Sequence, residues 1–135
     1  MQSFVIQGGR PLSGTIRASG NKNGALPILA ATVLASEEVV LSNLPRIRDV
    51  EVMVELLGDL GADATWTGPN EVRVDSSGVS KTELDPDLCR EIRASFLLAG
   101  PLLARFGRAV VPPPGGEVIG RRRLDTHIHA FAELG

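Results

Sequence analysis

Apolar residues recur at helical spacing over residues 49–60, which is the clearest pattern in the chain. Intervals of three and four residues place them on one face of a helix, and acidic residues occupy the other face. Asp49 is expected to cap the start of this helix, and Gly61 to end it in a left-handed conformation. The apolar face comprises Val50, Met53, Val54, Leu57 and Leu60, and the water-facing side Glu51, Glu55 and Asp59.

An earlier helix is predicted over residues 25–35, where nearly every residue is apolar. Asn23 is positioned to cap it, and Pro27 falls in the first turn, where a missing backbone N–H is tolerated. A helix that is apolar all round has no face suited to water. We therefore expect this helix to be buried on all sides.

Two further helices are predicted in the second half of the chain. One runs over residues 86–105 and is expected to be disturbed at Gly100 and Pro101. The other occupies residues 125–135, with Asp125 as its cap. A polar and proline-rich loop connects the two helices.

Strands are predicted where apolar and polar residues alternate or where a short apolar run lies between turn residues. Two hairpins and two single strands are expected from these patterns. They are residues 3–7 and 12–18 around a turn at 8–11, residues 62–66 and 71–75 around a turn at 67–70, and the single strands 38–41 and 108–111.

The order of these elements predicts a mixed α/β fold, of class α+β, built on a βαβαββ unit that begins to repeat. The helix at 49–61 corresponds to the helix at 125–135, but the second copy has no closing hairpin. We therefore expect a truncated part of a longer repeat protein, with unpaired sheet edges. Residues 21–135 would hold one complete and one incomplete unit, and residues 1–20 the N-terminal hairpin.

Composition agrees with one soluble globular domain: 135 residues are 43% hydrophobic and 22% charged. The formal net charge of -2 favours neither nucleic acid nor an anionic membrane as a partner. No apolar run is long enough to span a bilayer, and the N-terminus does not resemble a signal peptide. Cys89 is the only cysteine, which excludes an internal disulfide and suits a reducing compartment, so a cytoplasmic location is expected.

Lys22 and Arg93 are candidates for anion binding. Lys22 lies between two asparagines at the start of a helix, where free N–H groups and the helix dipole favour an anion. A solvated lysine beside an asparagine cap would have the same spacing. Arg93 lies in an otherwise apolar helix, where it could equally extend to solvent or pair with an acid such as Glu91.

The loop at residues 112–123 combines three prolines, three glycines and three arginines. Glycines allow close approach of the backbone to a ligand, and arginines bind phosphates or carboxylates at two points. Glu117 is the only acid in this loop and would be a general acid if burial kept it protonated. An ordinary surface loop, with Glu117 paired to its arginines, remains the alternative.

The remaining residues that could bind a metal or act in catalysis do not indicate a further site. His127 and His129 are two apart in a helix and point in different directions, so we assign no metal. Cys89 lies on an apolar helix face, which favours a core residue over a nucleophile. The sequence contains no phosphate-binding loop, dinucleotide motif or catalytic triad, and we assign no cofactor.

Three separated segments together resemble the UDP-N-acetylglucosamine enolpyruvyl transferase (1-carboxyvinyltransferase) family. They are Ser19–Ile28, Arg93–Leu102 and Gly115–His127. The Lys22–Asn23 pair matches this family better than its sister, the shikimate-phosphate enolpyruvyl transferases. The resemblance covers the whole chain and implies two domains of βαβαββ units, of the inside-out barrel type. It also implies that residues 1–20 belong to the second domain.

The resemblance implies an activity on two small substrates, phosphoenolpyruvate and UDP-N-acetylglucosamine. The family transfers the enolpyruvyl group of the former to the sugar 3'-hydroxyl by addition and then elimination of phosphate, which commits the sugar to peptidoglycan. The resemblance assigns the role of general acid to Glu117. Lys22, Asn23 and Arg122 are assigned to phosphoenolpyruvate, and Arg93, Arg122, Arg123, Leu124, Asp125, Thr126 and His127 to UDP-N-acetylglucosamine.

Three positions depart from the family pattern. Most members have cysteine and some have aspartate where this chain has Glu117, Arg123 replaces a usual proline, and Leu97 replaces a common tryptophan. A related enzyme with another nucleotide acceptor, and a non-catalytic anion-binding or structural fragment, therefore remain alternatives. Because the family's presumed base for the sugar hydroxyl lies outside this chain, we expect it to need the remainder of the parent protein for turnover.

Overall fold

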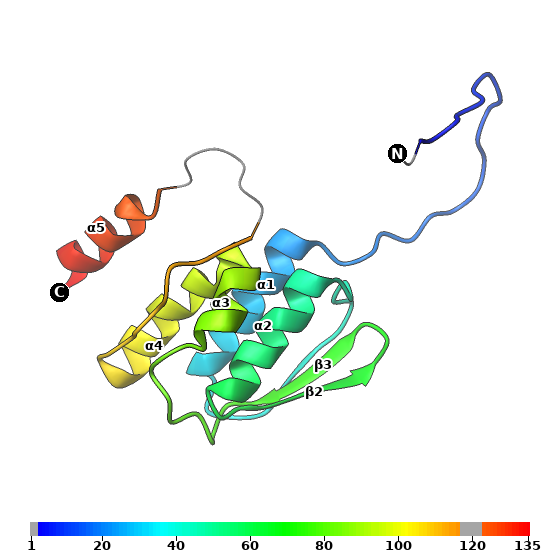
Figure 1. The fold of residues 1–135 in the computed structure, drawn as a ribbon. Coiled ribbons are helices and arrows are strands. Elements are labelled where there is room, and N and C mark those ends of the chain that lie inside the picture. The colour runs from blue at the N-terminus through cyan, green and yellow to red at the C-terminus, as the bar shows by residue number, and fades with distance from the viewer. Residues whose placement is uncertain (1–2, 117–122) are drawn as a thin grey trace.

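The computed structural model describes residues 3–116 and 123–135, and helices packed beside a small sheet form its centre (Figure 1). The mixed α+β class predicted from the sequence is confirmed. In chain order the elements are α1 (Lys22–Ala31), the 3-10 turn η1 (Thr32–Leu34), β1 (Val39–Leu41), α2 (Arg48–Asp59), β2 (Asp63–Gly68), β3 (Glu71–Asp75), α3 (Pro86–Glu91), the 3-10 segment η2 (Arg93–Leu98), α4 (Ala99–Phe106) and α5 (Asp125–Leu134).

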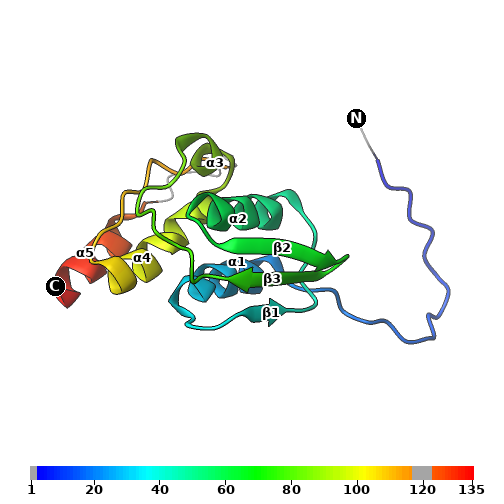
Figure 2. The ribbon, with the colours of Figure 1, turned by 90° about the horizontal axis from the view of Figure 1, so that it is seen from below.

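The sheet has three antiparallel strands in the order β1-β3-β2, and α1 and α2 lie on one of its faces (Figures 1 and 2). The predicted hairpin at 62–75 and the strand at 38–41 are confirmed. Along β3 the side chains alternate, so that Val72 and Val74 are buried under the helices while Arg73 faces outward. On that outer face Arg73 bonds to Glu38 at 2.8 Å and to Asp63 at 2.7 Å, which links the three strands.

The packing of α2 against the sheet follows the predicted apolar face. Val50, Met53 and Leu57 are fully buried, and Gly61 ends the helix with a φ of 105°. Asp49 is not the cap, because the helix begins one residue earlier at Arg48, after Ile47. The carboxylate of Asp49 accepts a hydrogen bond from Lys22 instead.

The first helix differs from its prediction in two respects. Asn21, and not Asn23, is the N-cap: its side-chain oxygen accepts from the N–H groups of Asn23 at 2.7 Å and Gly24 at 3.1 Å. Burial is also confined to one side, since Ile28 and Leu34 are 50% and 54% exposed. The helix contacts α2 and η2, but among the described residues nothing covers its outer face.

The predicted helix at 86–105 is three segments. The change from the 3-10 segment η2 to the α-helix α4 comes at Ala99, directly before the predicted disturbance at Gly100, but the break at Ile92 was not expected. Ile92 is extended, with φ -133° and ψ 138°. The carbonyls of Cys89 and Arg90, which would otherwise continue the helix, accept from the N–H groups of Gly115 and Gly116 at 2.9 and 3.1 Å. Pro101 falls in the first turn of α4, where its missing N–H has no helical partner to lose.

The strand predicted at 108–111 is reduced to a single parallel bridge between Val110 and Glu83. Val110 still exchanges two backbone hydrogen bonds, with Thr82 at 2.8 Å and Leu84 at 3.0 Å. The prolines at 112–114 follow at once and lack the N–H groups that a longer ladder needs. The last helix, α5, begins at Asp125 as expected, although Leu124 occupies the cap position.

The hairpin predicted at 3–18 does not form in this structure. Residues 3–18 contain no strand, and they extend away from the helices and the sheet (Figure 1). Phe4, Val5 and Leu12 are more than nine-tenths exposed. A two-stranded hairpin is marginal in water without a surface to bury its apolar side chains, and no described element supplies one.

Candidate active site

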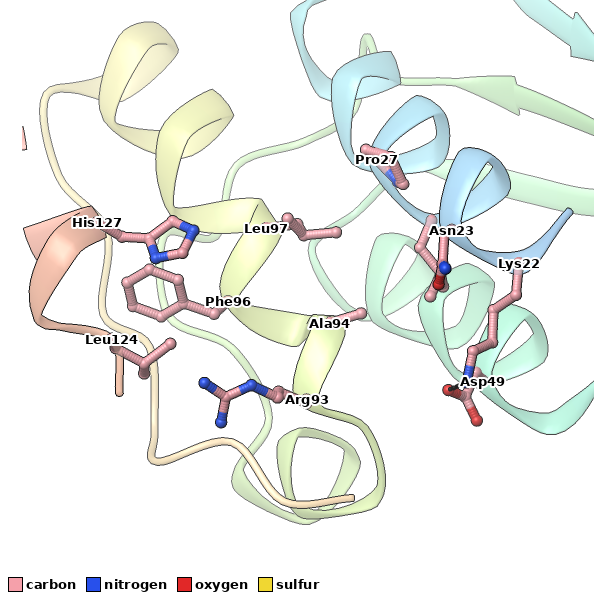
Figure 3. Close-up of a pocket in the computed structure, with 11 residues that line it drawn as sticks. Lys22, Asn23, Pro27, Asp49, Arg93, Ala94, Phe96, Leu97, Leu124 and His127 are labelled. Atoms are coloured by element: carbon pink, nitrogen blue, oxygen red, sulfur yellow. Dashed lines mark hydrogen bonds and ion pairs between the residues drawn. The ribbon is translucent and has the colours of Figure 1, made fainter. Parts of the chain in front are cut away.

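A cavity of about 360 Å³ lies where the first turns of α1, α2 and η2 meet the start of α5 (Figure 3). These elements are separated by up to 100 residues in the sequence, so tertiary packing alone brings them together. The lining is cationic and polar at one side and apolar at the other. Its residues are Lys22, Asn23, Leu26, Pro27, Asp49, Arg93, Ala94, Phe96, Leu97, Leu124 and His127.

Lys22 and Asp49 form the polar wall on the α1 and α2 side (Figure 3). The Lys22 ammonium donates to the Asp49 carboxylate at 2.9 Å, and both side chains are 40–48% exposed. The cap at Asn21 sets the direction of the first turn of α1 and so directs Lys22 and Asn23 towards the cavity. A lysine held in this way offers its remaining donors to an anion.

Arg93 forms the cationic part of the η2 wall. It begins η2 immediately after the extended residue Ile92, which changes the chain direction between α3 and η2. Its guanidinium points towards the α5 side of the cavity, where Nη2 donates to the backbone carbonyl of Arg123 at 3.4 Å (Figure 3). The interruption at Ile92 therefore positions a guanidinium group within the cavity wall.

The apolar side of the cavity is built from η2 and α5. The rings of Phe96 and His127 meet edge to face, with centroids 5.6 Å apart and planes at 78°. Phe96 also lies 6.4 Å from Phe131, which packs over Gly100. These contacts hold the start of α5 against η2, a geometry in which aromatic pairs are favourable. Leu97 and Leu124 complete this wall.

Several residues assigned from the sequence meet in this cavity. Lys22, Asn23, Arg93, Leu124 and His127 all line it. Three other assigned residues do not line the cavity, namely Arg123, Asp125 and Thr126. Arg123 forms an ion pair with Asp125 at the edge of the cavity, and Thr126 follows in the first turn of α5. Glu117 and Arg122 lie outside the described residues.

Two of the cavity residues that were not predicted as site residues carry a charge or an aromatic ring, namely Asp49 and Phe96. Asp49 was expected to be a helix cap, and Phe96 was assigned no role. The signal for Asp49 was its place in the first turn of a helix. It lies 27 residues after Lys22 in the sequence, and only the packing of α1 on α2 makes the two neighbours. Phe96 is adjacent to Leu97, the position at which this chain departs from the family pattern.

Within the described residues, no cluster of three or more His, Cys, Asp or Glu side chains is arranged to hold a metal ion. Cys89 lies on the buried side of α3, and burial raises the pKa of its thiol. The described lining of the cavity thus offers one ammonium group, one guanidinium group, a carboxylate, the Asn23 amide and the His127 imidazole, beside the ring of Phe96. No helix in the described part of the chain is both long and apolar enough to cross a membrane.

Comparison with known protein families finds a match that covers the chain from residue 6 onward. The family model for EPSP synthase (3-phosphoshikimate 1-carboxyvinyltransferase) matches residues 6–135. The chain belongs to the EPSP synthase family. This match places the chain among the enolpyruvyl transferases, as the three motifs predicted.

Similar proteins in this family carry the name UDP-N-acetylglucosamine 1-carboxyvinyltransferase. The one from Bradyrhizobium diazoefficiens is 55% identical over 132 residues, covering 98% of this chain and 31% of the relative. The one from Treponema denticola is 52% identical over 135 residues, covering the whole chain and 32% of the relative. The chain thus spans about a third of the length of these relatives.

A solved structure supports the same fold. The crystal structure of the enolpyruvyl transferase NikO from Streptomyces tendae superposes with a TM-score of 0.63 at 36% sequence identity. The match covers 74% of this chain and 23% of NikO. The described part of this EPSP synthase family chain therefore has the fold of an enolpyruvyl transferase.

Proposed function

We propose that this chain, within a protein of its relatives' length, transfers the enolpyruvyl group of phosphoenolpyruvate to the 3'-hydroxyl of UDP-N-acetylglucosamine and releases phosphate. The observation that carries the proposal is the convergence of Lys22, Asn23 and Arg93 on one cavity. Two separate motifs of the family supply these residues. The names of the relatives support the acceptor, because the identity of 52–55% extends over nearly the whole chain.

The electrostatics of the cavity suit substrates with several negative charges. Phosphoenolpyruvate carries a phosphate and a carboxylate, and the UDP-sugar carries a diphosphate. Lys22 and Arg93 provide fixed positive charge, and the N-terminal ends of α1, α2 and α5 point their partial positive charge towards the same region. Such pre-arranged charge stabilises negative charge that develops during addition and elimination.

The residue roles follow the family motifs. Lys22, Asn23 and Arg122 would bind phosphoenolpyruvate. Arg93 would bind the UDP-sugar, and Arg122 would contact anionic groups of both substrates. Leu124 and His127 line the cavity and so are available to the uridine end of the sugar nucleotide. The full set assigned to UDP-N-acetylglucosamine is Arg93, Arg122, Arg123, Leu124, Asp125, Thr126 and His127.

Glu117 would be the general acid of the addition step. The sugar 3'-oxygen bonds to C2 of phosphoenolpyruvate as its hydroxyl proton passes to a base in the rest of the longer protein, and the Glu117 carboxyl gives its proton to the C3 methylene, which becomes a methyl group. In the elimination the Glu117 carboxylate would take a proton back from that methyl group. The C2–C3 double bond then re-forms, and phosphate leaves with the electrons of its bond to C2. The loop that carries Glu117 begins at Gly115 and Gly116, whose N–H groups bond to the end of α3 next to Arg93.

A second candidate is the same transfer to a different nucleotide acceptor. Two observations favour it: Leu97, which replaces a common tryptophan, lines the cavity, and the likeness to NikO shows that the fold serves other members of the enolpyruvyl transferases. A smaller side chain at this position changes the apolar surface that an acceptor would contact. Comparison of acceptors would separate the two candidates.

The experiment is an assay of phosphate release by the protein at its relatives' length, with phosphoenolpyruvate and a panel of UDP-sugars and free uridine nucleotides. Release that requires UDP-N-acetylglucosamine supports the first candidate, and release with another nucleotide alone supports the second. Turnover with none of these acceptors would exclude both. Glu117→Gln keeps the shape of the side chain without its acidic proton, so turnover should fall steeply while UDP-sugar binding changes little.

A covalent probe tests the position of Glu117 separately. Fosfomycin alkylates a thiol at this position, so the unaltered protein should resist it and Glu117→Cys should become sensitive. Labelling of the unaltered protein at residue 117 would contradict the assignment. This probe does not depend on the identity of the acceptor.

We further infer that residues 1–20 complete a sheet of the second domain in the longer protein, and that residues 21–135 belong to the first. The exposed apolar side chains of Phe4, Ile6 and Leu12 support this, because burial would offset the entropy of ordering them. We also infer a cytoplasmic role in peptidoglycan synthesis. The single unpaired thiol of Cys89 suits that reducing compartment.

A further inference from the structure

The first residue of α2 is tied to the last residue of α3 by a charged contact that the proposed function does not use. The Arg48 guanidinium donates to the Glu91 carboxylate through Nε at 2.9 Å and through Nη2 at 2.6 Å. Its third contact, from Nη1 to Glu55 at 2.8 Å, stays within α2. Arg48 therefore joins two elements that are 43 residues apart in sequence.

Each end of this contact is next to a cavity residue. Arg48 precedes Asp49, the partner of Lys22, and Glu91 comes two residues before Arg93. The contact thus adds a charged link between the Lys22 wall and the Arg93 wall, beside the packing of α1 and α2 against η2. Neither Arg48 nor Glu91 lines the cavity.

The end of α3 needs such a contact because the helix does not continue into η2. At Ile92 the backbone is extended, so no helical hydrogen bond carries the orientation of α3 forward to Arg93. The buried side chain of Ile92 fixes the position of the break, and Glu91 supplies a second attachment point beside it. Together with the hydrogen bonds from Gly115 and Gly116 to the carbonyls of Cys89 and Arg90, these attachments restrict rotation of the segment that leads to Arg93.

We propose that Glu91, held by Arg48, is a positioning residue that sets the placement of Arg93 relative to Lys22 across the cavity. The inference rests on the proposed function, since it assigns Arg93 to the UDP-sugar. Both side chains are 41–54% exposed, so the contact is a modest one. Its loss should therefore change substrate binding by a few-fold and leave the fold intact.

The test uses the protein at its relatives' length, with Glu91→Gln compared against Glu55→Gln. Each substitution removes one carboxylate from the same Arg48, but only Glu91 links the two walls. Glu91→Gln should raise the KM for UDP-N-acetylglucosamine about threefold to fivefold, the range of a partly exposed charge pair. The KM for phosphoenolpyruvate should stay the same, and so should both values in Glu55→Gln.

Two further variants separate positioning from general destabilisation. Arg48→Met should reproduce the Glu91→Gln effect, and the double variant should be no worse than either single one, because both remove one contact. Arg48→Lys retains a charge and should recover part of the loss. A general loss of folded protein would lower the apparent kcat without changing one KM selectively.

Amide hydrogen exchange provides a readout that needs no substrate. Exchange over residues 92–98 should quicken in Glu91→Gln and not in Glu55→Gln. Unchanged exchange, equal KM effects of the two substitutions, or additive effects of Arg48→Met and Glu91→Gln would each overturn the positioning role. If the unaltered protein turns over none of the acceptors, the proposed function fails, whereas normal turnover with unaffected variants removes only this inference.

Discussion

Gly115 and Arg90 approach so closely that a side chain on the glycine would overlap the Arg90 carbonyl oxygen. The neighbouring N–H groups of Gly115 and Gly116 complete the contact by bonding to the carbonyls of Cys89 and Arg90. This contact attaches the loop at residues 112–123 to the end of α3. The helix ends two residues before Arg93, which lines the cavity. The glycines of this loop thus serve a tertiary contact.

Gly115→Ala should therefore destabilise the chain by about 1–3 kcal/mol, the usual cost of forcing atoms into a filled space. Urea denaturation gives the free energy of unfolding. Gly58→Ala is the matched control: Gly58 lies in α2, and nothing is within 4 Å of the added Cβ. This substitution should stabilise the chain by roughly 0.5 kcal/mol or more through helix propensity. Equal effects of the two substitutions would contradict the close contact.

Lys22→Ala should lower kcat/KM in the protein at its relatives' length, because a cation that faces developing negative charge is lost. The fall should correspond to a loss of roughly 3 kcal/mol or more of transition-state stabilisation. Lys81→Ala is the control, since Lys81 makes a similar ion pair, to Asp59 at 2.7 Å, away from the cavity. It should leave kcat/KM unchanged. Steady-state assays with both substrates check this, and an unaffected Lys22→Ala variant would remove the lysine from the reaction.

Acid should destabilise the fold through Asp63 and Asp75. Hydrogen bonds from Thr65 and Arg73 lower the pKa of Asp63, and bonds from Ser77 lower that of Asp75, below the ordinary value of 3.8. Because the folded pKa is the lower one, these carboxylates stabilise the fold fully above pH 3.8 and lose that contribution as the pH falls through their folded values.

Urea denaturation at a series of acidic pH values tests this dependence. The Asp63→Asn and Asp75→Asn double variant should be less stable than the unaltered chain near neutral pH and should lose less stability below pH 3.8. Gly58→Ala should shift stability by the same amount at every pH, because it changes no ionisable group. Parallel curves for the double variant and the unaltered chain would show that other groups dominate acid unfolding.

The different burial of Leu57 in α2 and of Leu34 in η1 predicts contrasting effects of two leucine substitutions. Leu57 is fully buried, so Leu57→Ala should cost about 2–5 kcal/mol from lost burial and the cavity left behind. Leu34 is 54% exposed, and Leu34→Ala should cost no more than about 1 kcal/mol. Urea denaturation of each variant and of the unaltered chain measures the two losses in the free energy of unfolding. A comparable loss at Leu34 would mean that its outer face is covered in solution.

Much of the local structure could be predicted from the residues themselves. Helix α2 carries its apolar residues at regular intervals, and the hairpin of β2 and β3 has a turn sequence between two alternating runs, so both followed from local patterning. The three motifs also predicted the family and five of the cavity residues. Local spacing and turn chemistry act over a few residues, which is the range that a sequence pattern describes.

Other features depended on contacts between distant segments. The helix at 86–105 is interrupted at Ile92 because Gly115 and Gly116 bond to its carbonyls, and no pattern within those 20 residues could indicate this. Asp49 faces Lys22 because α1 packs against α2. The N-terminal residues alternate as a hairpin does, but alternation needs a surface to cover, and the described residues offer none.

The sequence by itself therefore determined which segments could become helices or strands and which residues carry the charge of the site. The tertiary structure alone decided where the third helix breaks and that Lys22 and Arg93 share one cavity. The physical reason is that propensity and spacing are local energies of a few tenths to about one kcal/mol per residue. Burial, close backbone contact and long-range hydrogen bonds add larger energies once distant segments meet.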